Sequence, residues 1–161
     1  MSERLTHLDD SGRARMVDVS GKPVSKREAT ARGRVRMAAE TFARAQSGDT
    51  PKGDIRAIAE IAGVMGGKRT SDLIPLCHPL PLSSVKVEVT PDPAAHAFIV
   101  TARAATTGQT GVEMEALTAV SIACLTIYDM LKAIDRDMVI DDICLLAKSG
   151  GASGDYVRSA P

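Results

Sequence analysis

Apolar residues recur at helical spacing in two long segments. The first begins near Asp54, a favourable N-cap, and its apolar residues fall at i, i+3, i+4, i+7 and i+10: Ile55, Ile58, Ala59, Ala62 and Met65. Gly66 and Gly67 are expected to weaken the end of this helix. The second helix is predicted from about Val112 to Ile134, with an apolar seam at 3,4,3,4,3 spacing: Leu117, Val120, Cys124, Ile127, Leu131 and Ile134. Other apolar residues lie off this seam, so we expect this helix to pack between a sheet and another subunit.

Alternation of apolar and polar residues predicts the strands. The segments expected to form strands are 16–19, 85–89, 97–105 and 138–146. Residues 26–37 carry arginine at alternate positions, which suits one face of a strand, although alanine-rich neighbours also allow a helix. Residues 38–47 are expected to be helical. The resulting order of helix, strand, strand, helix and strand, after one or two earlier strands, suits a two-layer α+β sandwich with an antiparallel sheet and helices on one face.

Composition indicates one domain and argues against two classes of function. A chain of 161 residues corresponds to one domain, expected as a single catalytic domain at 16–154, with a flexible arm at 1–15 and a flexible tail at 155–161. The formal net charge of zero argues against a general nucleic-acid binder. Aromatic residues make up 2% of the chain and tryptophan is absent, which argues against binding single strands by base stacking.

Cysteine usage and hydropathy point to the cytoplasm. The three cysteines form no Cys-x-x-Cys pair, so neither a metal site nor a disulfide framework is predicted, and reduced thiols are expected. The N-terminus lacks the apolar centre of a signal peptide. The longest charge-free helical stretch, Ala116 to Tyr128, has 13 residues, which is too short to cross a bilayer. We therefore expect a cytoplasmic protein without a membrane segment.

A proline-rich segment, residues 72–82, is the most distinctive stretch of the chain. It reads D-L-I-P-L-C-H-P-L-P-L, and its three prolines exclude a continuing helix and favour an extended, stiff path. Cys77 and His78 lie in its middle, where a rigid backbone would present the imidazole to a binding or catalytic site. The alternatives are a core crossing with an incidental histidine, and a nucleophilic Cys77.

Residues 62–69 come close to a phosphate-binding P-loop and fail on three counts. Ala62 stands where the leading glycine belongs, Arg69 stands where Ser or Thr should follow the lysine, and the preceding segment is predicted as helix. We reject an NTPase motif. Lys68 and Arg69 remain either phosphate contacts or ordinary charges at a helix end.

The second predicted helix carries charged residues at both ends. Asp129 and Lys132 stand three residues apart, as an ordinary surface ion pair or as a partly buried pair whose lysine has a lowered pKa and exchanges protons. Glu113 and Glu115 open the helix, where acidic residues also suit the helix dipole. About 21 Å of helix separates Glu115 from Asp129, so one small site that used both would need two chains. Lys52 precedes the first helix, where it could contact a phosphate or have no role.

Five segments of the sequence together resemble one family. They are K-G-D at 52–54, A-G-V-M-G-G-K-R-T-S-D-L-I-P-L-C-H-P-L at 62–80, T-G-V-E-M-E-A-L-T-A-V-S at 110–121, L-T-I-Y-D-M-L-K-A at 125–133 and K-S-G-G at 148–151. The chain, from about Met16 to Gly154, resembles the cyclic pyranopterin monophosphate synthase family of molybdenum-cofactor biosynthesis, also called the accessory protein C family. Gly66 and Gly67 depart from the alanines expected there.

The resemblance implies an activity, a fold and an assembly. The fold would be a ferredoxin-like α+β sandwich, assembled as a homohexamer of three dimers with sites between subunits. The substrate would be 3',8-cyclo-7,8-dihydroguanosine 5'-triphosphate, made by an upstream radical SAM enzyme. The reaction would yield cyclic pyranopterin monophosphate and diphosphate without net redox change, so no organic cofactor is expected, and an accompanying Mg²⁺ stays open.

The resemblance also assigns roles to residues. Asp129 matches the catalytic aspartate, and Lys132 and Lys52 match lysines used in catalysis. The substrate-binding positions are Leu76, Cys77, His78, Met114 and Glu115, with Glu113 beside them. Our own further candidates for triphosphate contacts are Arg27, Lys68 and Lys148. These residue types suit proton transfer during ring rearrangement and attack of a sugar hydroxyl on the α-phosphorus. A non-catalytic nucleotide-binding module is the rival class, and a GTP hydrolase is a weaker rival.

Overall fold

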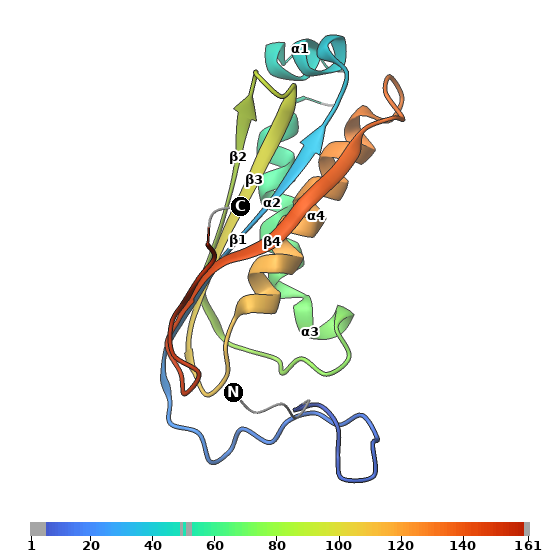
Figure 1. Cartoon of the computed structure of the whole chain (residues 1–161). Coiled ribbons are helices and arrows are strands. Elements are labelled where there is room, and N and C mark those ends of the chain that lie inside the picture. Colours follow the sequence, from blue (N-terminus) through green and yellow to red (C-terminus); the bar gives the residue numbers. More distant parts are fainter. Residues whose placement is uncertain (1–5, 49, 51–52, 160–161) are drawn as a thin grey trace.

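The computed structural model describes residues 6–48, 50 and 53–159 of the chain (Figure 1). Its elements follow in the order β1 (Ser25–Arg36), α1 (Ala39–Ser47), α2 (Ile55–Lys68), α3 (Thr70–Leu73), β2 (Leu82–Asp92), β3 (Ala97–Gly108), α4 (Glu113–Leu131), β4 (Val139–Ser149) and β5 (Tyr156–Val157). Within the described residues the strands form one sheet in the order β2-β3-β1-β4-β5, and all neighbours are antiparallel. The predicted α+β sandwich with an antiparallel sheet is confirmed.

The central strand β1 resolves the ambiguity left by its arginines. Its buried residues alternate with Arg32, Arg34 and Arg36, which lie on the opposite face of the sheet. Asp141 of β4 accepts hydrogen bonds from the Nε atoms of Arg34 and Arg36, each at 2.8 Å. The strand prediction is therefore confirmed, and the helical alternative is wrong.

The two neighbours of β1 pair with it differently. Against β3 the register is continuous, from Ser25 opposite Gly108 to Arg36 opposite Ala97. Against β4 the register shifts twice, once after Thr30 and once after Arg32. The irregularities of the sheet near β1 are therefore confined to its β4 side.

Helices α2 and α4 lie on one face of the sheet, as Figure 1 shows. α4 contacts β1, β3 and β4, and α2 contacts both β2 and α4. The predicted seam of α4 is buried at Val120, Cys124, Ile127 and Leu131. By length and composition alone this 19-residue helix would also qualify as a membrane span, with a mean hydropathy of 1.4. Its contacts with the sheet and with α2 are those of a core helix.

Two glycines allow α2 and α4 to approach closely. A Cβ atom on Gly66 would lie 2.6 Å from Cγ1 of Ile122, which no real contact tolerates. A Cβ on Gly67 would be only moderately tight, at 3.3 Å from its nearest neighbours. Both residues are buried and α2 continues through them to Lys68. The helix therefore includes both glycines, whose close packing against α4 offsets their low helix propensity, and the expected weakening of the helix end stays a prediction.

Several predicted boundaries need correction. No strand forms over residues 16–19, which run without regular pairing. The proline-rich segment does not start extended at Asp72, because the short helix α3 includes that residue. The second long helix ends at Leu131, and Lys132 caps it, so Ile134 is exposed beyond its end. Within the segment expected to be a tail, Tyr156 and Val157 pair with β4.

Candidate active site

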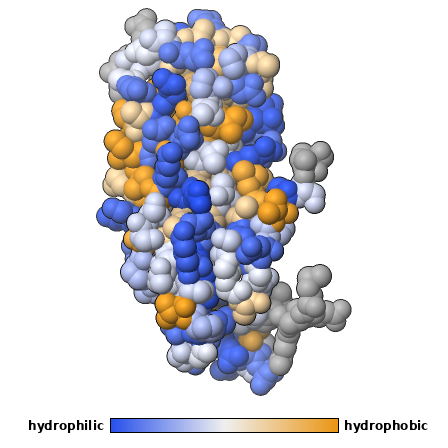
Figure 2. Space-filling model, turned by 90° about the vertical axis from the view of Figure 1, so that its left-hand side faces the viewer, coloured by the Kyte–Doolittle hydropathy of each residue, from blue (hydrophilic) through white to orange (hydrophobic). Residues whose placement is uncertain are grey.

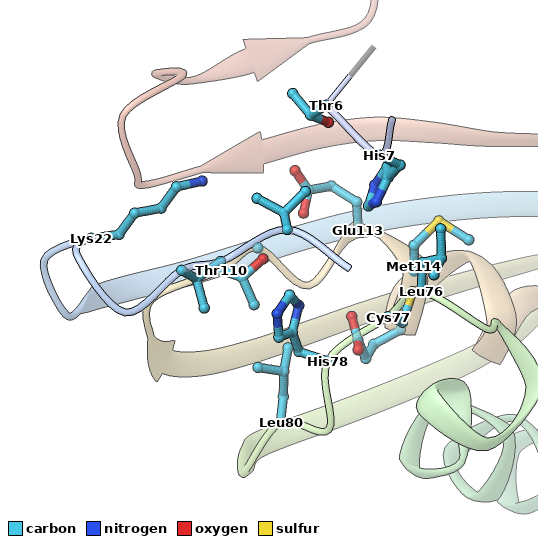
Figure 3. A pocket seen from close by; sticks show the side chains of 14 residues that line it. Thr6, His7, Lys22, Leu76, Cys77, His78, Leu80, Thr110, Glu113 and Met114 are labelled. Atoms are coloured by element: carbon cyan, nitrogen blue, oxygen red, sulfur yellow. The ribbon is translucent and has the colours of Figure 1, made fainter. Parts of the chain in front are cut away.

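The first cavity lies where the proline-rich segment meets the start of α4. Its volume is about 310 Å³, and its wall includes Cys77 and His78 from the proline-rich segment and Glu113, Met114 and Glu115 from the first turn of α4. Figure 3 shows the segment that carries Cys77 and His78 on one side of the pocket, with Thr110 and Glu113 on the other. The structure therefore brings together residues that lie far apart in the sequence.

The proline-rich segment is fixed on both sides of His78. On one side, the amide of Cys77 donates a hydrogen bond to the carbonyl of Ile74 at 3.1 Å, closing a turn directly after α3. On the other side, the hydroxyl of the fully buried Thr106 donates to the carbonyl of Pro81 at 2.8 Å. Three prolines stiffen the backbone between these anchors. His78 is half-buried and lines the cavity, so it is not an incidental histidine inside the core.

Glu115 is the most deeply buried acidic group of this cavity. Only 5% of its surface is exposed. Burial raises the pKa of Glu115, and the negative charge of Glu113 raises it further. A carboxyl group with a raised pKa holds its proton closer to neutral pH, which suits a group that binds or exchanges a proton with a ligand.

Cys77 lies beside Glu115. Burial raises the pKa of the Cys77 thiol, and the charge of Glu115 adds to the effect. The thiol is therefore held protonated, whereas a nucleophilic cysteine needs an electropositive setting that lowers its pKa. The surroundings of Cys77 argue against the nucleophile alternative and favour a contact role.

A second cavity, also about 310 Å³, adjoins the first and is lined by cations. Lys22, Arg27 and Lys148 contribute positive charge, and Glu28 and Glu113 contribute negative charge. Nζ of Lys148 lies 3.7 Å from Oε1 of Glu113. The two sequence-based candidates Arg27 and Lys148 thus lie in one cavity, brought there by adjacent antiparallel strands.

A glycine turn closes over Arg27. Arg27 is 7% exposed, and its guanidinium donates through Nε to the carbonyl of Gly108 at 3.3 Å. Gly151 follows β4 with a φ of 87°, and a Cβ there would lie 1.6 Å from Nη1 of Arg27. The positive φ favours glycine at this position, and a Cβ there would also require the Arg27 guanidinium to move. The K-S-G-G motif therefore serves to seat Arg27 in the cationic cavity.

The two cavities form one elongated site. Lys22, Thr110, Gly111 and Glu113 line both of them. One half of the site offers an imidazole, a thiol and a buried carboxyl group, and the other offers ammonium and guanidinium groups. Such a division suits a ligand with a polar ring at one end and several anionic groups at the other.

Asp129 and Lys132 lie at the opposite end of α4. Nζ of Lys132 is 2.6 Å from Oδ1 of Asp129, and the two side chains are 54% and 61% exposed. The hydrogen bond to Asp129 and the charge of that carboxylate raise the pKa of Lys132. The expectation of a partly buried lysine with a lowered pKa is therefore wrong for a single chain. Since α4 is continuous, about 21 Å separates Asp129 from Glu115.

The remaining predicted residues fall in three groups. Leu76 and Met114 line the first cavity as expected. Lys68 is exposed at the end of α2 and lines neither cavity, so its proposed triphosphate contact is not supported within one chain. Lys52 lies outside the described residues. Over the residues that the structure covers, no group of three or more His, Cys, Asp or Glu side chains could hold a metal ion.

Sequence reasoning missed the N-terminal wall of the site. Thr6, His7, Val17, Val19 and Lys22 line the first cavity, although residues 1–15 were expected to form a loose arm. The pKa of Asp18 is lowered by the hydrogen bond from the Ser20 amide, and to a lesser degree by nearby His78. The available sequence signal was Lys22, which stands between Ser20-Gly21 and Pro23. This signal does not reveal which surface of the molecule the N-terminal segment covers.

The fold and its divided pocket define an α+β sandwich protein with an elongated pocket, one half of which is lined by Lys22, Arg27 and Lys148. The chain belongs to the MoaC family, whose model matches residues 16–151. A relative from Cereibacter sphaeroides is 60% identical over 156 residues, covering 97% of this chain and 98% of its own. One from Chloroflexus aurantiacus is 61% identical over 154 residues (96% and 94%), and one from a Nostoc species is 55% identical over 160 residues (99% and 95%). Each relative is named cyclic pyranopterin monophosphate synthase.

Proposed function

We propose that this protein is a lyase of molybdenum-cofactor biosynthesis that converts 3',8-cyclo-7,8-dihydroguanosine 5'-triphosphate to cyclic pyranopterin monophosphate and diphosphate. The observation that carries this proposal is the identity of about 60% to relatives of that name over nearly the whole of both chains. The reaction involves no net redox change, so it requires no redox cofactor. Mg²⁺ bound to the triphosphate is compatible with the scheme.

The divided pocket supports this assignment by its chemistry. The guanine-derived ring system occupies the cavity of His78, Cys77 and Glu115, where imidazole and carboxyl groups orient ring nitrogens and carbonyl groups. The triphosphate occupies the cavity of Arg27 and Lys148, whose positive charges stabilise the negative charge that develops as diphosphate leaves. Arg27 is nearly buried, and a desolvated guanidinium interacts with phosphate more strongly than a solvated one.

Proton transfer is assigned to Asp129, Lys132 and Lys52, as the family resemblance implies. Within one chain Asp129 lies about 21 Å from Glu115 along α4, too far to serve the same substrate. The proposal therefore includes an active site shared between chains, in which one subunit supplies the pocket and another supplies the Asp129–Lys132 pair. Packing against another chain would also desolvate Lys132 and lower its pKa towards the range useful for proton transfer.

The surface of the chain is compatible with such an assembly. Helices α2 and α4 expose large apolar side chains that a single chain does not cover: Ile58, Ile61, Met65 and Leu125. Figure 2 shows hydrophobic patches interrupting a mainly hydrophilic surface on the face it views. The proposed assembly is a homohexamer built as three dimers, located in the cytoplasm and supplied with substrate by a radical SAM enzyme.

The decisive experiment supplies the purified cyclised triphosphate to the purified protein and follows the products by mass spectrometry. The proposal expects cyclic pyranopterin monophosphate and one diphosphate per turnover. Lys132→Ala should abolish turnover while the oligomer remains intact. A non-catalytic nucleotide-binding module would bind the substrate and return it unchanged, and a GTP hydrolase would release phosphate from GTP itself; either result from the wild-type protein contradicts the proposed function.

A further inference from the structure

The turn that follows α4, residues 132–137, is tied to the start of α1. Oδ2 of Asp135 accepts a hydrogen bond from the amide of Ala38 at 3.0 Å, across 97 residues of chain. Oδ1 of Asp135 accepts from the amide of Asp137 at 3.0 Å, which orients the carboxylate within the turn. Figure 1 shows α1 and the connection from α4 to β4 at the same end of the molecule. One carboxylate therefore links two elements that are far apart in the sequence.

Helix α1 has no side-chain cap of its own, and Asp135 takes that place. The N-cap residue Ala38 is extended, and its methyl group cannot accept a hydrogen bond. The pKa of Asp135 is lowered, chiefly by the hydrogen bond from the Ala38 amide and further by one from the Thr41 hydroxyl. The dipole of α1 also favours a negative charge at this end of the helix. Asp135 thus provides, from another part of the chain, the carboxylate that a glutamate at the third helical position gives in a capping box.

α1 is itself anchored in the core. Its buried residues are Thr41, Phe42 and Ala45, and the rings of Phe42 and Phe98 lie 5.3 Å apart, centroid to centroid. Phe42 and Ala45 belong to the main cluster of buried apolar residues. Asp135 is therefore attached to a part of the molecule that close packing holds in place.

The other end of the link is the last turn of α4. The amide of Lys132 donates to the carbonyl of Tyr128 at 2.8 Å. The amide of Asp135 donates to the carbonyl of Leu131 at 3.1 Å, so the turn continues directly from the helix. The side chains of Asp129 and Lys132 are more than half exposed, so the core does not confine them. Their placement depends on the backbone of this last turn.

We propose that Asp135 is a positioning residue for the Asp129–Lys132 pair: by capping α1 it fixes the turn 132–137, and so holds the last turn of α4 in one orientation. This inference rests on the proposed function, in which the pair transfers protons to a substrate bound in the pocket of another chain. Asp135 does not contact the substrate, and its carboxylate acts only through the backbone.

The first test compares kcat and KM of Asp135→Ala with those of the wild type, on the cyclised triphosphate and with the oligomer verified. kcat should fall about 10- to 100-fold, because a misplacement of about 1 Å at the reacting groups costs up to that factor. KM should stay within about twofold, because the substrate pocket lies at the other end of α4. An unchanged kcat, or a KM that rises as much as kcat falls, would overturn the inference.

Two further variants separate the hydrogen bond from the charge. Asp135→Asn should keep most of kcat, since its amide oxygen can still accept from the Ala38 amide. A loss as large as that of Asp135→Ala would show that the charge acts instead and would overturn the inference. Asp137→Ala is the matched control, because Asp137 is exposed in the same turn and its replacement removes the same charge. It should behave like the wild type, and an equal loss there would also count against Asp135.

A double-mutant cycle breaks the same hydrogen bond from the α1 side. Ala38 has a φ of −63°, which proline adopts, so Ala38→Pro removes the donor while the backbone keeps its conformation. kcat should fall about 3- to 10-fold, because the hydrogen bond from the Thr41 hydroxyl remains. In the Asp135→Ala background the same substitution should have no further effect. Independent losses that multiply would show that the two residues act separately and would overturn the inference.

Hydrogen exchange tests the geometric part without any substrate. In Asp135→Ala the amides of the last turn of α4 should exchange about tenfold faster than in the wild type, and those of its first turn at the wild-type rate. If the wild-type protein failed to turn over the cyclised substrate, the proposed function would fall, while the exchange rates would still decide whether Asp135 holds the end of α4. If turnover occurred but exchange at the last turn matched the wild type, only the inference about Asp135 would fall.

Discussion

Replacing Glu115 with glutamine should stabilise the protein above neutral pH. Because burial raises the pKa of Glu115 above its ordinary value of 4.5, the unfolded chain releases this proton at lower pH than the folded chain does. Below about pH 4.5 the group is protonated in both states and has no effect on the pH dependence. As pH rises through the raised pKa of the folded protein, the folded state loses stability relative to the unfolded state. Glutamine does not titrate, so Glu115→Gln should lack this loss.

The expected gain in the free energy of unfolding of Glu115→Gln follows from the burial of the carboxylate. Glu115 is 5% exposed, and leaving a buried polar group without full compensation costs about 1–3 kcal/mol. Glu115→Gln should therefore be about 1–3 kcal/mol more stable at pH 8 and equal to the wild type within about 0.5 kcal/mol at pH 4. The same variant should lose turnover, because glutamine cannot exchange a proton with the substrate. Stability and activity should therefore change in opposite directions.

Urea unfolding from pH 4 to pH 9, at one fixed protein concentration, measures this difference. Glu88→Gln serves as the control, since Glu88 is exposed on β2 and its replacement removes the same charge from water. The control should show no pH-dependent gain. The reasoning fails if Glu115→Gln is destabilising at pH 8, or if its gain is the same at every pH.

Three further predictions concern packing, assembly and the thiol. Gly66→Ala should destabilise the protein by about 1–3 kcal/mol relative to Gly67→Ala in chemical unfolding, because its Cβ would lie 2.6 Å rather than 3.3 Å from its neighbours; equal stabilities would contradict the close approach of the helices. Mixing inactive Glu115→Gln with inactive Lys132→Ala should restore activity to about a quarter of the sites in random mixed oligomers, and no rescue in verified mixtures would count against a shared site. Cys77→Ser should keep its turnover rate within about tenfold, since the thiol is protonated, whereas a loss of about a thousandfold would reveal a nucleophile.

Periodicity predicted the elements that bury one face. The seam of α4 and the alternation of β2 and β3 appear in the sequence because each element packs one side against the core. The end of α4 was placed too late, since Ile134 continues the apolar spacing although the helix stops at Leu131. An apolar residue just beyond a helix cannot be told from one inside it by spacing alone.

The sequence predicted only those site residues that belong to recognisable motifs. The proline-rich segment and the first turn of α4 were identified, and the fold brings them together at one cavity. The contribution of residues 16–22 was missed because their position depends on Gln109, 87 residues from Lys22 in the chain. Extended segments without ladder partners have no periodic signature, so such a contact becomes visible only when the chain is folded.

The unbroken pairing of β1 with β3 limits how this protein can vary in length. Side chains on a strand alternate between its two faces, so a one-residue insertion or deletion directly after Arg27 within the pairing would send its guanidinium to the other face of the sheet and bring a neighbour into the cavity. The β-bulges in the pairing of β1 with β4 could not absorb such an insertion or deletion, because they lie on the other side of the strand and beyond Arg27. Homologous chains should therefore differ by substitution along these two strands and gain or lose residues only in the loops that join them to the rest of the molecule.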